Sequence, residues 1–105
     1  MSLDEVYAFE ASGRLTFVNS RSGRFDVDLS LAALDSTFQG EFLRPHRNWL
    51  VNRRYIKVLE RGDSDLELCV GASLDDAALL RVPVARERAA AVRDALLASA
   101  TGLRK

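Results

Sequence analysis

The side chains of this 105-residue chain that are best suited to bind an anionic partner are concentrated near its middle. No acidic residue occurs between Glu41 and Glu60. The basic and titratable side chains in that interval are Arg44, His46, Arg47, Arg53, Arg54 and Lys57. Over the whole chain 15 Lys and Arg balance 15 Asp and Glu, so net charge provides no general attraction to nucleic acid. The stretch therefore indicates either a local basic binding face or an ordinary solvated surface.

Residues that catalyse reactions or bind metal ions are sparse in the sequence. His46 is the single histidine, and the sequence places no nucleophile or acid partner beside it. Asp75 and Asp76 are adjacent, so their side chains diverge, and we expect them to be solvated loop residues. One cysteine, Cys69, and one histidine cannot assemble a structural zinc site. The glycines form no phosphate-binding loop, which argues against nucleotide binding. From these observations together we predict no enzyme activity, no metal and no cofactor.

Aromatic residues interleave with the central basic residues. Trp49 and Tyr55 could stack on the bases of a single strand. Trp49, Leu50 and Val51 are consecutive, however, which favours a role in anchoring the core beneath a basic loop.

We expect Cys69 to be partly exposed, with a packing role favoured over a redox switch.

The first 29 residues are predicted to form strands. Residues 5–10 and 14–20 are rich in Val, Phe, Tyr and Thr, and residues 11–13 between them suit a hairpin turn. A second turn is predicted at 21–23. The apolar residues that then alternate with charged ones are Phe25, Val27 and Leu29. This period of two predicts a half-buried strand.

One short helix is predicted after these strands. Leu31, Leu34 and Phe38 stand at helical intervals. Ser30 is placed to cap the N-terminus of the helix, and Gly40 to close the segment.

The stretch 42–57 is neither cleanly alternating nor cleanly helical, and Pro45 argues against a helix through it. We predict a loop between elements there. Residues 55–61 and 65–70 predict a hairpin around a turn at 62–64.

The last strand is predicted over 79–84, where Pro83 indicates an edge position or a strand end. A helix is predicted from Ala85 to near Gly102 in an Ala-rich stretch. The residues of its apolar stripe are Ala85, Ala89, Val92 and Leu96.

These elements predict a mainly β fold in a single domain over residues 1–105. Residues 1–3 could be remnants of expression. The sequence has no run of roughly 18 apolar residues and no signal peptide, so we expect a soluble cytoplasmic domain with no membrane association.

The residues from Phe42 to Asn52 have the sequence FLRPHRNWLVN and are followed by Ile56. They contain, in order, a phenylalanine, a basic residue, a His-Arg pair, an aromatic residue and a Val-Asn pair. This central motif resembles the signature of the LytTR family of bacterial DNA-binding domains. The flanking motifs are Ser30-Leu31-Ala32-Ala33-Leu34 and Pro83-Val84-Ala85-Arg86. The resemblance extends from Val6 to about Leu97.

The resemblance implies an elongated antiparallel β-domain with one short internal helix and a C-terminal helix, which inserts loops into the major groove of double-stranded DNA. Family members usually form the output half of response regulators in two-component systems, bind direct repeats in promoters and often bend the DNA. The residues that match base-reading positions are Arg14, Arg47 and Arg86. Those that match phosphate-contacting or loop-positioning sites are Arg44, His46, Asn48 and Arg88. Arg53 and Arg54 are basic residues that could equally be solvated.

Two alternatives stay open at this point. A protein-interaction module with the same fold would agree with the zero net charge, with Glu87 beside Arg86 and with the long segment 72–78. A small enzyme using His46 would need a partner group that the sequence does not place.

The resemblance also implies that a receiver or sensor domain lies outside this chain. We expect a monomer or weak dimer off DNA, with the C-terminal helix either covering the β-core or offering a partner surface.

Overall fold

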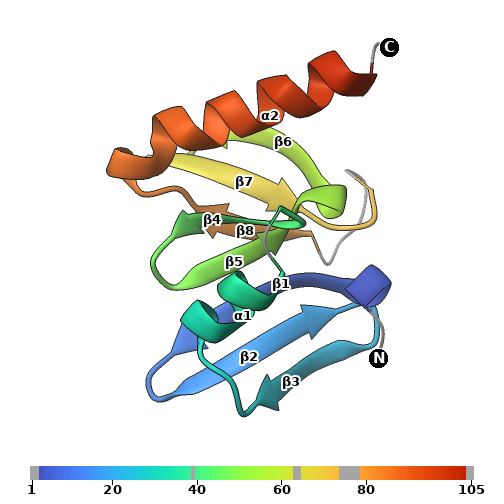
Figure 1. Cartoon of the computed structure of the whole chain (residues 1–105), viewed down its shortest axis with the longest axis vertical. Coiled ribbons are helices and arrows are strands. Elements are labelled where there is room, and N and C mark those ends of the chain that lie inside the picture. The colour runs from blue at the N-terminus through green and yellow to red at the C-terminus, as the bar shows by residue number, and fades with distance from the viewer. Residues whose placement is uncertain (1–2, 39, 63–64, 74–78, 104–105) are drawn as a thin grey trace.

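The computed structural model describes residues 3–38, 40–62, 65–73 and 79–103. Short 3-10 helices (η), strands and α-helices alternate along the chain (Figure 1). In order they are η1 Leu3–Glu5, β1 Val6–Ser12, β2 Leu15–Ser20, β3 Gly23–Val27, α1 Leu31–Thr37, β4 Phe42–His46, β5 Trp49–Asn52, η2 Arg53–Tyr55, β6 Ile56–Arg61, β7 Leu66–Val70, β8 Leu80–Pro83, η3 Arg86–Arg88 and α2 Ala89–Leu103.

The strands form two antiparallel sheets. A five-stranded sheet has the order β3-β2-β1-β5-β4, and a three-stranded sheet has the order β6-β7-β8. Glu10 of β1 lies opposite Phe17 of β2 on one side and opposite Trp49 of β5 on the other. Strand β1 is therefore central, although β5 follows it by more than 35 residues in the sequence. The mainly β fold with two α-helices agrees with the sequence prediction.

Two hydrophobic clusters lie on opposite faces of the five-stranded sheet. Leu50 packs in a cluster with residues of α1, whereas the next residue, Val51, packs with residues of the three-stranded sheet and α2. Consecutive strand residues point to opposite faces, so β5 contributes to both clusters. Figure 1 shows α1 beside the five-stranded sheet and α2 lying across the three-stranded sheet. The molecule measures 36 × 28 × 27 Å along its principal axes.

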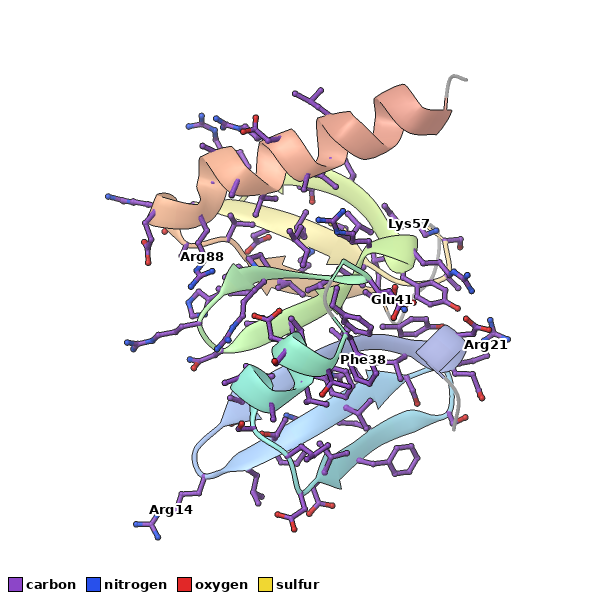
Figure 2. All side chains as sticks on the ribbon, viewed as in Figure 1. Arg14, Arg21, Phe38, Glu41, Lys57 and Arg88 are labelled. Atoms are coloured by element: carbon purple, nitrogen blue, oxygen red, sulfur yellow. The ribbon has the colours of Figure 1, made fainter. Side chains whose placement is uncertain are left out.

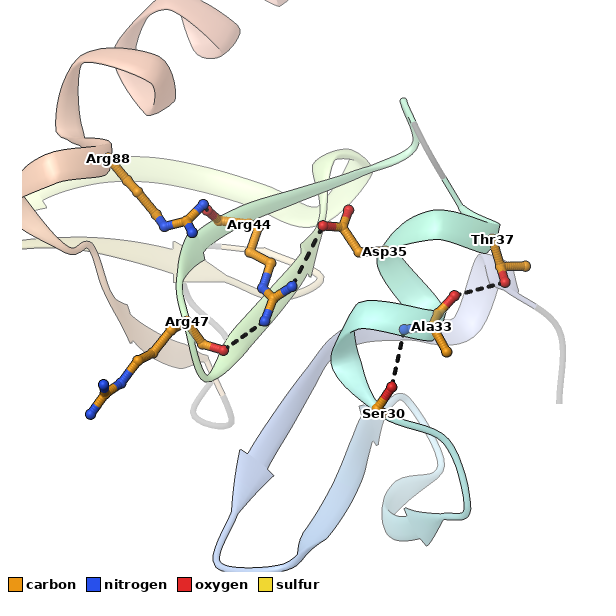
Figure 3. Close-up of polar contacts among 7 residues, drawn as sticks. All are labelled: Ser30, Ala33, Asp35, Thr37, Arg44, Arg47 and Arg88. Atoms are coloured by element: carbon orange, nitrogen blue, oxygen red, sulfur yellow. Dashed lines mark hydrogen bonds and ion pairs between the residues drawn. The ribbon is translucent and has the colours of Figure 1, made fainter.

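Local sequence explains where α1 begins. The Ser30 hydroxyl accepts a hydrogen bond from the Ala33 amide at 3.1 Å, which caps the helix as the sequence predicts (Figure 3). Leu31 and Leu34 are buried on one side of the helix. After the helix Gly40 adopts a positive φ of 85°, a conformation that glycine tolerates best.

The prediction of a loop over 42–57 is wrong, because this stretch contains strands β4 and β5 and the 3-10 helix η2. Leu50 and Val51 are both completely buried, so β5 lacks the alternation that marks a strand with one exposed face. Pro45 is tolerated within β4 because this strand is at the edge of its sheet and its pairing register shifts between Leu43 and His46. The predicted core role of Trp49, Leu50 and Val51 is confirmed.

Two burial predictions are also wrong. Phe25 is 45% exposed and Leu29 54% exposed, because β3 is an edge strand and ends at Val27. Cys69 is buried rather than partly exposed, since the side chains of Glu60 and Arg81 on the neighbouring strands lie close to it.

The C-terminal helix begins later than predicted. Ala85 has an extended backbone, η3 follows it, and α2 starts only at Ala89. Val92 and the partly buried Ala89 and Leu96 pack on the β-core, so this stripe covers the protein's own core. Both positions predicted for Pro83 are confirmed, because β8 is an outer strand and Pro83 is its last residue.

Several predictions concern residues that the structure does not describe. Asp75 and Asp76, most of the segment 72–78, and residues 63 and 64 of the predicted turn lie outside the described ranges. Residues 1 and 2 do so as well.

Candidate nucleic-acid interface

Three connections meet at one edge of the molecule. Because β1 and β5 are antiparallel, the turn after β1 and the turn before β5 lie together, and the Ala11 amide donates to the Asn48 carbonyl at 2.8 Å. The Ala85 amide donates to the Pro45 carbonyl at 2.9 Å, which places the start of η3 beside β4. We call the polar side chains of these connections, of the adjoining end of β4 and of η3 the basic edge. Its residues are Arg14, Arg44, His46, Arg47, Asn48, Arg86 and Arg88.

Arg14 lies at the tip of the β1–β2 hairpin. Ser12 pairs with Leu15, which leaves Gly13 and Arg14 as a two-residue turn. The positive φ of Gly13, 63°, fits such a turn. Figure 2 shows the exposed Arg14 side chain extending away from the body of the protein, on the same side as Arg88.

The β4–β5 turn presents Arg47 and holds Arg44 inward. The Arg44 guanidinium donates to the Arg47 carbonyl at 2.9 Å and lies 3.6 Å from the Asp35 carboxylate of α1. The side chain of Arg44 is only 24% exposed. Arg47 is exposed, and its side chain points away from the turn (Figure 3). Arg44 thus connects α1 to the backbone that carries Arg47.

His46 and Arg88 also organise this turn. The Nδ1 atom of His46 accepts a hydrogen bond from the Asn48 amide at 3.1 Å. Arg88 donates to the Arg44 carbonyl at 3.3 Å and thereby joins η3 to β4. Asn48 itself is exposed at the tip.

Arg86 pairs with an acid from another hairpin. Its Nε donates to the Asp65 carboxylate at 3.0 Å, while the Arg86 side chain remains 85% exposed. The hydrogen bond with Asp65, together with the negative charge of that group, raises the pKa of the Arg86 guanidinium.

Arg53 and Arg54 are not part of this edge. They lie in η2, which follows the opposite end of β5, and Arg54 forms an ion pair with Asp4 at 2.8 Å. Asn52, the last residue of the central motif, has a structural role. Its buried side chain donates to the Val6 carbonyl at 2.9 Å and accepts from the Arg54 amide at 3.1 Å.

Sequence reasoning missed the acidic partners at the basic edge. Asp35 is separated from Arg44 by 9 positions, and Asp65 from Arg86 by 21. No spacing rule pairs residues across such distances, because the tertiary fold alone brings them together.

Neither a metal-binding cluster nor a membrane-spanning helix is found among the described residues. Among them there is no group of three or more His, Cys, Asp or Glu side chains that could hold a metal ion. None of the described helices has the length and the run of apolar residues that a membrane span requires.

Comparison with known proteins points to DNA. The LytTr DNA-binding domain family matches residues 1–97. A solved LytTr DNA-binding domain from Bacillus cereus superposes with a TM-score of 0.76 and 26% identity, covering 91% of this chain and 84% of that one.

Two curated relatives come from Paraburkholderia xenovorans. They are the heme-containing CO-sensing transcriptional regulators RcoM 1 and RcoM 2, which are 31% and 30% identical over 97 residues. The matches cover 91% of this chain, which spans 35% of the length of each regulator.

Proposed function

Because this chain belongs to the LytTr DNA-binding domain family, we propose that it binds double-stranded promoter DNA in a sequence-specific way through its basic edge. The observation that carries the proposal is the convergence of three separate connections at one edge. Each of them presents an exposed arginine, and these are Arg14, Arg47 and Arg86. Three readers on rigidly joined connections can contact bases at separated positions of one duplex.

The chemistry of arginine suits this task. A guanidinium carries five N–H donors in a fixed fork, and guanine presents two acceptors, O6 and N7, in the major groove. A bidentate contact of this kind contributes about 1–3 kcal/mol of discrimination against the wrong base. Arg47 has the strongest structural support, since its turn is held by Arg44, His46 and Arg88 while its own side chain is exposed.

The remaining residues of the basic edge divide into two roles. Asn48 is exposed beside Arg47 and is suited to contact a phosphate. Arg44 and His46 direct their polar atoms into the turn and serve to position it. Arg88 is half-buried and bonded to β4, so its first role is to hold η3 in place, with its remaining donors available to a phosphate.

The sites in DNA are proposed to be direct repeats, each occupied by one copy of this domain. Off DNA the domain is a monomer or weak dimer. The domain itself catalyses no reaction, and its control comes from a receiver or sensor segment outside the chain or from a partner. Action on promoters places the protein in the bacterial cytoplasm.

The test is selection of bound sequences from a random duplex pool, followed by titration of the best site at two salt concentrations. Enrichment of a repeated motif, with affinity falling as salt rises, supports the proposal, since phosphate contacts release counterions. No enrichment by folded protein at low salt would contradict it and would favour a protein-interaction module with this fold.

A further inference from the structure

We propose that Asp65 is a positioning residue for Arg86, which holds the guanidinium so that its two terminal nitrogens face the DNA. This inference rests on the proposed function, because it concerns how one of the three base readers is oriented.

The contact between the two side chains leaves the reading edge of Arg86 available. Asp65 binds Nε, on the side of the guanidinium fork, at 3.0 Å. A bidentate contact with O6 and N7 of guanine can use the terminal nitrogens at the other end of the fork. The side chain is 85% exposed, so those nitrogens are accessible to a duplex.

The backbone on both sides of this contact is fixed. The Val84 amide donates to the Leu66 carbonyl at 2.9 Å, which joins the residue next to Asp65 to a residue two positions before Arg86. The Gly62 amide donates to the Asp65 carbonyl at 2.7 Å and closes the hairpin end. A Cβ at Gly62 would lie 3.0 Å from that carbonyl and 2.7 Å from Cδ of Glu67, so glycine permits this close approach. The backbone at Asp65 is therefore held by hydrogen bonds on both sides, through its own carbonyl and through that of Leu66.

An acid at a DNA-binding edge has two opposing effects. Its charge repels phosphates, which lowers affinity for every duplex to a similar extent. Its bond to Arg86 orders a flexible side chain before binding, which favours only the duplex with a guanine in the right place. An exposed ion pair contributes little to folding, so a variant at this position is expected to fold.

The two effects are separated with the Asp65→Asn variant and three duplexes. The first is the selected site, the second has the base pair that depends on Arg86 replaced, and the third is unrelated in sequence. This base pair is identified as the one whose replacement lowers the affinity of the unaltered protein but not the affinity of the Arg86→Ala protein. We expect Asp65→Asn to lower discrimination at that pair by about three- to tenfold, with affinity for the unrelated duplex equal or higher. In the Arg86→Ala background Asp65→Asn is expected to leave discrimination unchanged.

The matched control is Glu87→Gln, which removes an exposed negative charge next to Arg86 in sequence. It is expected to raise affinity for all three duplexes alike. If Asp65→Asn does the same, and Asp65→Ala, which also removes the acceptor of the Arg86 Nε–H bond, retains discrimination, then Asp65 is only a repelling charge and the inference is overturned. An Arg86→Ala protein that discriminates as the unaltered protein does also overturns it. Failure of the unaltered protein to select any site would instead overturn the proposed function.

Discussion

The two asparagines of the central motif serve different purposes, although they are four positions apart. Asn52 is buried and bridges the Val6 carbonyl and the Arg54 amide, so it holds β5 and η2 to the N-terminal part of the chain. Asn48 is exposed in the turn next to Arg47. Under the proposed function the motif thus combines a residue that maintains the fold with a residue that contacts DNA.

This difference predicts the effect of replacing each asparagine. Asn52→Ala leaves two backbone groups without their partner, and we expect a loss of about 1–3 kcal/mol in the free energy of unfolding, measured by urea denaturation. Asn48→Ala is expected to change that free energy by less than about 0.5 kcal/mol and to weaken DNA binding. Equal effects of the two substitutions on stability would contradict this assignment.

Arg47 is expected to act at the DNA and not in the fold. Arg47→Ala should lower affinity for the selected site by about 1–3 kcal/mol, roughly 5- to 150-fold, with an unchanged melting temperature. Arg53→Ala is the control, because it removes the same charge at the other end of β5. Binding assays and thermal unfolding on both proteins provide the measurement, and an Arg47→Ala protein that binds its site normally would refute the role.

At the scale of elements, the β4–β5 turn depends on a contact with α1. Arg44 spans the gap between the Asp35 carboxylate and the Arg47 carbonyl. The short helix therefore supports the turn as well as covering one face of the sheet. The buried residues of α1, Leu31 and Leu34, lie close in sequence to Asp35, which pairs with Arg44. The packing of α1 therefore influences the position of the turn that presents Arg47.

Salt dependence distinguishes the two possible roles of Arg44. If Arg44 positions the turn, Arg44→Leu lowers specific affinity while the slope of log K against log salt stays the same. If it contacts a phosphate, the slope decreases in magnitude by about one unit. We expect the unchanged slope, because the side chain is directed into the protein.

The elements show how far the sequence could be interpreted. Ser30, Leu31 and Leu34 predict α1 correctly, because capping and helical spacing are local signals. Strand β5 was missed because its residues are buried on both faces, and burial by distant elements leaves no alternation. The pairing of Arg86 with Asp65 could not be predicted, since it depends on how two hairpin ends meet.

At the scale of the whole molecule, the central strands β1 and β5 contribute to both hydrophobic clusters. Loss of either cluster would expose residues of the same strands, so we expect the two sheets to unfold together. Cys69 offers a probe of this behaviour because it is buried in β7 of the three-stranded sheet.

Burial, reinforced by a hydrogen bond to Glu60, raises the pKa of the Cys69 thiol. The reactive thiolate is therefore scarce in the folded protein near neutral pH, and alkylation by iodoacetamide should be much slower than in urea. Because the folded state holds this proton more tightly, stability from this group is complete below the ordinary pKa and declines as pH rises above it. Mass spectrometry across a urea series should show alkylation following unfolding. Rapid alkylation of the native protein would show that Cys69 is accessible.

The backbone bonds between the three connections have a mechanical consequence. Ala11 is joined to Asn48 and Ala85 to Pro45, so the spacing of the arginine-bearing connections is set by the peptide framework and not by flexible segments. Under the proposed function such a framework acts as a fixed template, and the duplex supplies the deformation needed to fit it. Base pairs that no side chain touches then affect affinity through their stiffness, so that the protein measures the compliance of its site as well as its sequence.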